Sequence, residues 1–290
     1  KPQTTEEWSY TVKGEPWYNF QWLSTIIICV IYGIGEHGEN SLIIFRAFVI
    51  FILFIVIGLI LNRIIHQEIS HLSRSALIFF LLLTVYVGSA FRLQMRSEIF
   101  IFVIYAGIIL LWHIELSNRY KIILSLIASI LASNLHTGSA PFPIGLAILF
   151  IITNNEAKFK SKILWIFLSL LTIFLTPYTY KAIPILYKHV FYSSYNILVN
   201  PDHQPLSLRH FNINEFGLSG IAFGFLFLSG WFGFIISGKP YSSNVKNRIF
   251  AGLFGIFLTI MSINRIRTLP YFAIFFVPLT AYLLGDIFRC

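Results

Sequence analysis

The sequence predicts an all-α protein, a polytopic transmembrane helical bundle of about nine spans with one additional interfacial helix. Hydrophobic residues make up 57% of its 290 positions and charged residues only 11%, whereas soluble domains carry about 25% charged residues. The mean hydropathy is +0.76. The apolar residues fall into separate runs divided by short polar connections, as in a chain that crosses a membrane repeatedly.

Nine apolar runs are candidate spans. A helix needs roughly 20 residues to cross the hydrocarbon core, and several of the runs are shorter than that. The runs are residues 41–61, 75–91, 98–114, 121–135, 141–153, 163–176, 218–236, 249–263 and 269–288.

A tenth apolar run, residues 22–34, has polar residues at both ends. Gln21 precedes it, and Glu36, His37 and Glu39 follow it. Its short length and its polar flanks favour a helix lying on the membrane surface, while a spanning helix remains the alternative.

The runs divide one transmembrane domain into four parts. Residues 1–40 form an outer loop with the interfacial helix, and residues 41–176 form a first helical bundle. Residues 177–217 are a long outer loop, in which we expect a helix over 182–196, and 218–290 hold the C-terminal spans. Long loops in compact proteins are usually functional.

Positive charge predicts the orientation of the bundle, because short cytoplasmic loops are rich in Lys and Arg. One set of short loops carries most of these residues and is therefore expected to be cytoplasmic. The set consists of Arg63, Arg74, Arg119, Lys121, Lys158, Lys160, Lys162, Lys239, Lys246 and Arg248. The opposite, outer face holds most of the carboxylates, so we expect the chemistry there.

Membrane headgroups account for the net charge of +9 without a nucleic-acid partner. Cys29 and Cys290 show neither disulfide nor metal spacing.

The stretch FRLQMRSEIF places Arg92 and Arg96 four residues apart on the outer face. Side chains at this spacing share a helix face, and guanidinium groups bind phosphate oxygens bidentately. The alternative is structural: both arginines reach lipid headgroups or pair with Glu98 and Glu215.

Other outer residues favour an assembled anion site. Arg265 and Arg267 lie at the mouth of another span on the same face. Asn134 and His136 end the run 121–135 there, and both can donate hydrogen bonds to a phosphate. The alternative is that His136 has a structural role, as a polar residue at the membrane interface whose hydrogen bonds are made within the protein.

Carboxylates near the N-terminus are candidates for a general base. Glu6 and Glu7 stand beside Trp8, and Trp17 and Trp22 follow. Tryptophans at this density indicate an interfacial belt. A carboxylate held at the membrane surface could accept a proton from an attacking hydroxyl or amine. Solvated loop acids are the alternative.

Several functional classes have no motif in the chain. It lacks GxxxxGK[ST], HExxH, GxSxG and CxxC, and its spans hold no series of acids suited to a proton relay. The sequence therefore gives no support to an ATPase, a zincin or a serine hydrolase. A transporter built from paired halves would need matching interrupted spans; Pro141 and Pro143 lie near a span entrance, and no matching half is apparent.

Five motifs in order resemble the GT-C superfamily of polytopic membrane glycosyltransferases, and within it a bacterial group of uncharacterised membrane proteins. They are EEWSYTVKGEPWYNFQWLS, similar to DPFSYTxxGxPWxxxEWLS; RLQMRSEIF, similar to RxxxRPxxF; SNLHTGSAPFPIG, similar to ANLHGGFxxG; TPYTYKAI, similar to NPYGxxLW; and NRIRTLPYFAIFFVPL, similar to RxxRFxPLFAIxxxPL.

The resemblance implies a role for each matching residue. Glu6, or Glu7 beside it, takes the place of the first-loop acid that acts as base or orients the acceptor. The expected phosphate-binding residues are Arg92, Arg96, Asn134, His136, Arg265 and Arg267. The chain departs from the pattern at Glu6 (usually Asp), Gln21 (usually Glu), Ser97 (usually Pro) and HTGS (usually HGGF).

The resemblance also implies a function. A polyprenyl-phosphate-linked sugar would be the donor, the acceptor stays unknown, and transfer would proceed by single displacement with inversion at the outer face of a bacterial plasma membrane. The arginines make a cofactor dispensable, although Asp202 or Glu215 could hold a divalent cation. The family places one more span before Lys1, so we expect an upstream span to be missing from this chain. The alternative function is non-catalytic binding or translocation of a polyprenyl-phosphate lipid.

Overall fold

The computed structural model describes residues 21–34, 38–65, 69–90, 93, 96, 98–154, 157–177, 179–181, 219–236, 245–264 and 268–289. Over these ranges the chain is all-α, as predicted. Its α-helices are α1 (Trp22–Tyr32), α2 (Gly38–Ile64), α3 (His71–Ser89), α4 (Glu98–His113), α5 (Asn118–Leu135), α6 (Pro141–Thr153), α7 (Phe159–Leu171), α11 (Ser219–Ile236), α12 (Val245–Asn264) and α13 (Leu269–Arg289). Thr172–Phe174 and Thr179–Lys181 form short 3₁₀ helices.

Each of the ten apolar runs coincides with one α-helix. Among the described helices, α2, α3 and the first 20 residues of α13 are long and apolar enough to cross a membrane, and several shorter apolar helices accompany them. Helices suit such segments because all their backbone groups bond within the segment. Local signals set their ends: the Ser70 hydroxyl accepts the Ser73 N–H at 3.2 Å before α3, and Pro141 occupies the first turn of α6.

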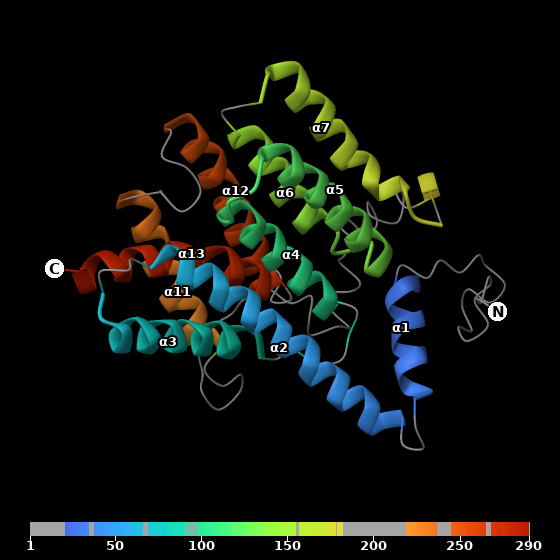
Figure 1. Ribbon diagram of the computed structural model, residues 1–290, viewed down its shortest axis with the longest axis horizontal. Coiled ribbons are helices and arrows are strands. Elements are labelled where there is room, and N and C mark those ends of the chain that lie inside the picture. The colour runs from blue at the N-terminus through green and yellow to red at the C-terminus, as the bar shows by residue number, and fades with distance from the viewer. Residues whose placement is uncertain are drawn as a thin grey trace.

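Helix α13 runs through the middle of the bundle and packs against α2, α3, α4, α11 and α12 (Figure 1). Its span is 67% buried, against 22% for α2. Tyr271 anchors its first turn: the ring stacks on Phe142 of α6, with centroids 4.1 Å apart, and meets Phe102 of α4 edge-on at 5.0 Å. The first turns of α4, α6 and α13 therefore lie together.

The outward surfaces of the bundle are apolar. Ile44 on α2, Phe79 on α3 and Leu228 on α11 are each about 70% exposed. Contiguous exposed apolar surface is rare on soluble monomers. Together with the three long apolar helices, it identifies an integral membrane protein.

Helix α1 has eleven residues, so it is about 16 Å long. That is roughly half the thickness of a bilayer core. It packs on α2 and α5, and in Figure 1 its axis is turned away from those of α4 and α5. These dimensions support the interfacial interpretation of residues 22–34.

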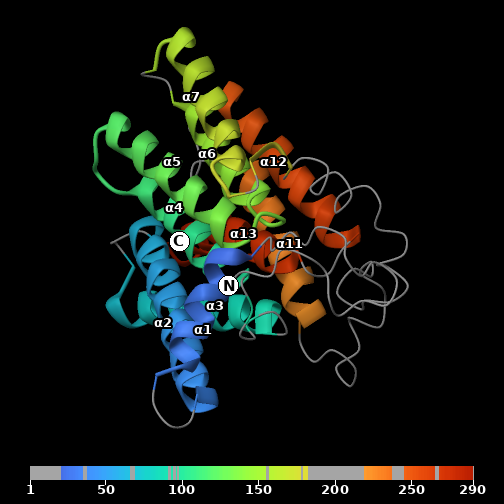
Figure 2. The same ribbon diagram turned by 90° about the vertical axis from the view of Figure 1, so that its right-hand side faces the viewer.

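Helices α4 and α5 form an antiparallel hairpin with two distinct ends. Glu98 and Leu135 lie at one end, and His113 and Asn118 lie at the other. Helix α6 packs on both helices, and Figure 2 shows α7 beyond α5 and α6, on the side away from α1, α2 and α3. The candidate functional site is at the Glu98 end.

Candidate functional site

His136 ends α5 and begins the turn into α6. Its backbone is extended, with φ −158° and ψ 92°, and its N–H still bonds to the Ala132 carbonyl at 3.0 Å. The ring Nδ1 accepts a hydrogen bond from the Ser139 N–H at 2.9 Å. Because Nδ1 is an acceptor, the proton of the neutral ring lies on Nε2.

The Nε2 atom of His136 faces the carboxylate of Glu98, at 3.8 Å from Oε1. Both side chains are largely buried, with 8% and 15% exposure. Glu98 is the first residue of α4, where a carboxylate also interacts favourably with the helix dipole. In this tautomer the imidazole can donate its Nε2–H to an oxygen acceptor.

Asn134 ties α5 to two other segments. Its Oδ1 accepts a hydrogen bond from Trp22 Nε1 at 3.1 Å, and its Nδ2 donates to the carbonyls of Ile130 and Leu175 at 2.8 and 2.9 Å. Beside it, the buried Ser24 hydroxyl is 2.9 Å from the Leu135 carbonyl. The first turn of α1 is thereby attached to the end of α5.

Arg46 of α2 binds the connection between α3 and α4. Its Nε donates to the Leu93 carbonyl at 2.6 Å, and the Leu93 side chain is buried. Arg96 follows three residues later; it is exposed and lies two residues before Glu98. The connection therefore presents a guanidinium group beside the first turn of α4.

The structure brings some of the predicted site residues together. Asn134 and His136 share the end of α5, and Arg96 lies two residues before α4, whose Glu98 faces His136. Glu6, Glu7, Arg92, Arg265 and Arg267 lie outside the described residues, as do Asp202, Glu215 and the helix expected over 182–196.

Sequence reasoning missed two contributors to this site. The sequence indicates Glu98 only as a partner for arginines, and Trp22 only as part of an aromatic belt. Nothing in the local pattern indicates that either meets the end of α5, because Trp22 is 112 residues away from Asn134. The acidic start of α4 was the one available signal for Glu98.

Within the described part of the chain, no group of three or more His, Cys, Asp or Glu residues could hold a metal ion. The chain matches no family model, no curated protein and no solved structure.

Proposed function

We propose that the protein is a membrane glycosyltransferase of the GT-C type, which moves a sugar from a polyprenyl-phosphate carrier to an extracytoplasmic acceptor. One observation carries the proposal. Glu98 and His136 form a largely buried acid–imidazole pair at one end of an apolar bundle, and the exposed Arg96 lies two residues before Glu98. A charged donor group at a membrane surface suits a phosphate attached to a lipid.

The positions of the helix ends support the same site. Tyr271 joins the first turns of α13, α4 and α6. In the sequence, Arg265 and Arg267 immediately precede α13, and Arg92 and Arg96 precede α4. The sequence thus carries four arginines within the few residues before these two helices, a charge density that favours a phosphate.

The proposed reaction is a single displacement. An acceptor oxygen or nitrogen attacks C1 of the sugar, the bond from C1 to the phosphate oxygen breaks, and polyprenyl phosphate leaves with the bonding electrons. Glu6 or Glu7 takes the acceptor's proton. The arginines and the Nε2–H of His136 stabilise the charge that develops on the phosphate, while Glu98 orients the imidazole.

The test uses the protein in lipid nanodiscs with a set of polyprenyl-phosphate sugars and a cell-envelope extract as the source of acceptors. Release of polyprenyl phosphate measures turnover, and a binding assay with the donors measures affinity. We expect Glu6→Gln to lower turnover about 10²–10⁴-fold while donor binding persists. Arg96→Gln should weaken donor binding about tenfold or more.

Arg63→Gln is the matched control, because Arg63 is an exposed arginine at the far end of α2. It should change neither turnover nor donor binding. Donor binding without turnover of any sugar would refute the enzyme and leave the second candidate below. Absence of donor binding would refute both.

The second candidate is a non-catalytic protein that binds or moves a polyprenyl-phosphate lipid. Two apolar hollows, of about 290 and 420 Å³, favour it. They lie along α3 and α11, share Phe80 and Phe225, and the larger also reaches Leu284 of α13. An apolar groove along the helices would accommodate a prenyl chain, and an enzyme would use the same groove for its donor.

A further inference from the structure

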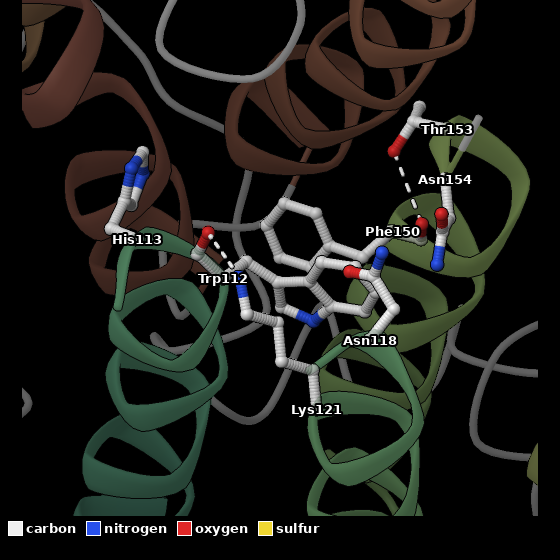
Figure 3. Close-up of a pocket in the computed structure, with 7 residues that line it drawn as sticks. All are labelled: Trp112, His113, Asn118, Lys121, Phe150, Thr153 and Asn154. Carbon is white, nitrogen blue, oxygen red and sulfur yellow. Dashed lines mark hydrogen bonds between the residues drawn. The ribbon is translucent and has the colours of Figure 1, made fainter. Parts of the chain in front are cut away.

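A separate polar cavity lies at the opposite end of the α4–α5 hairpin. It has a volume of about 220 Å³ and is formed by the end of α4, the first turn of α5 and the end of α6 (Figure 3). Helix α4 has 16 residues, so the cavity is about 24 Å from Glu98 along that helix. It therefore takes no part in the proposed sugar transfer.

Two stacked aromatic rings support the cavity. Trp112 and Phe150 lie 4.8 Å apart with an interplanar angle of 20°. The indole nitrogen of Trp112 bonds to the Ser125 hydroxyl at 3.3 Å, which holds the ring in place. Since water occupies about 30 Å³ per molecule, the cavity has room for a phosphate with its substituents.

Lys121 brings a positive charge into the cavity. Its ammonium group lies 5.9 Å from the centre of the Trp112 ring and contacts the Trp112 carbonyl at 3.5 Å, the upper limit of a hydrogen bond. By comparison, Lys162 bonds to the Ile152 carbonyl at 2.7 Å. The ammonium group of Lys121 can therefore turn to a ligand at little cost.

Two further features favour a bound polar ligand. Asn118 is the first residue of α5, whose first turn contains no acidic residue and receives no side-chain cap from Ser117. The N–H groups of such a turn attract negative charge. In addition, His113 lines the cavity, and its Nε2 is buried without a hydrogen-bond partner among the described residues. None of the residues that line the cavity is acidic.

We propose that this cavity binds a phosphate group, held by Lys121, Asn118 and the first turn of α5. A basic pocket between helix ends in a membrane protein is suited to an anionic lipid headgroup. Free phosphate offers the same oxygens, so the experiment distinguishes the two sources.

The experiment measures dissociation constants by ligand-dependent thermal stabilisation of the purified protein. The probes are short-chain phosphatidic acid, phosphatidylcholine with the same chains, and inorganic phosphate. Binding of phosphatidic acid alone assigns the site to a lipid headgroup, and binding of inorganic phosphate assigns it to a soluble anion. Binding of neither overturns the proposal.

Two variants test the location. Lys121→Gln should weaken binding about tenfold or more, while the exposed Lys160→Gln at the same end of the bundle should not. Asn118→Asp should weaken binding similarly without lowering the melting temperature, because an acidic side chain in the first turn stabilises a helix. Equal weakening by Lys121→Gln and Lys160→Gln would show diffuse attraction to the basic surface and overturn the site.

Discussion

Both the oxygen and the nitrogen of the Asn134 side-chain amide form hydrogen bonds. We therefore expect its removal to disturb the candidate site most. Asn134→Ala deletes bonds to Trp22, Ile130 and Leu175. We expect a loss of about 1–3 kcal/mol in the free energy of unfolding, measured by denaturation in detergent. The exposed Asn40→Ala should change it by at most about 0.5 kcal/mol. Equal losses of unfolding free energy for Asn134→Ala and Asn40→Ala would contradict the hydrogen bonds at Asn134.

Glu98 and His136 should act as a coupled pair. Glu98→Gln and His136→Gln each remove one partner of the 3.8 Å contact, so the second change should cost less once the first is present. In a double-mutant cycle on unfolding free energies we expect a coupling of about 0.5–3 kcal/mol. The exposed Glu115→Gln is the control for Glu98, and it should show no coupling to His136. If the changes in unfolding free energy for Glu98→Gln and His136→Gln simply add, the pairing is refuted.

The nature of these end residues was predictable, whereas their partners were not. Asn134 and His136 end an apolar run, and this made them candidates from the sequence. Their contacts with Trp22 and Glu98 come from other helices. Such contacts depend on helix packing, about which local spacing carries no information.

At the scale of the element, the contact between α11 and α13 depends on a missing side chain. A Cβ atom at Gly233 would lie 2.5 Å from the Leu279 carbonyl oxygen, which is backbone and cannot rotate away. Small residues allow this close approach between helices in membranes. Gly233→Ala should therefore separate the two helices.

We expect Gly233→Ala to lower the unfolding free energy by about 1–3 kcal/mol. Gly107 on α4 is the matched control, because no atom lies within 4 Å of a Cβ placed there. Gly107→Ala should be neutral or stabilise the protein by up to about 1 kcal/mol, since alanine is the better helix former. Thermal unfolding of both variants in one detergent measures the difference, and a neutral Gly233→Ala would contradict the close approach.

The positions of the helices were predicted well from hydropathy alone. The run 98–114, for example, corresponds to α4 at Glu98–His113, and the run 141–153 corresponds to α6. Polar connections and Pro141 mark these ends locally. Helix α2 is the more apolar of the two, as suits a helix that faces lipid, and α13 is the more buried. Hydropathy did not indicate which helices α13 packs against, because that depends on the shapes of the helix faces.

At the scale of the whole molecule, the proposed enzyme requires residues 1–20 and the Glu98 end of the bundle to lie on the same face of the membrane. A single cysteine at Thr5→Cys, in a background without Cys29 and Cys290, should react with a membrane-impermeant maleimide on intact cells. Ser161→Cys near the start of α7 should stay protected, because the positive charge around it predicts a cytoplasmic position.

Protection at position 5, with Ser161→Cys also protected and a lysed sample labelled at both, would place Glu6 opposite the arginines. Glu6 could not then act as their base, and lipid binding would become the better function. The eleven-residue length of α1 argues for labelling, because a helix of about 16 Å does not cross a bilayer core.

Composition and hydropathy were enough to predict a membrane-embedded all-α protein and the approximate positions of its helices, because burial in lipid leaves a hydropathy pattern that is local. Several helix ends differ from the predicted ones by up to five residues, as at α7 (Phe159–Leu171), which the run 163–176 predicts too late. It also indicated which helix ends carry arginines, carboxylates and histidines. The contacts of Glu98 with His136 and of Trp22 with Asn134, and the cavity that Lys121 and Asn118 line, are visible only in the folded bundle. Those contacts arise where helices distant in sequence pack together, and packing depends on the shapes of whole helix faces.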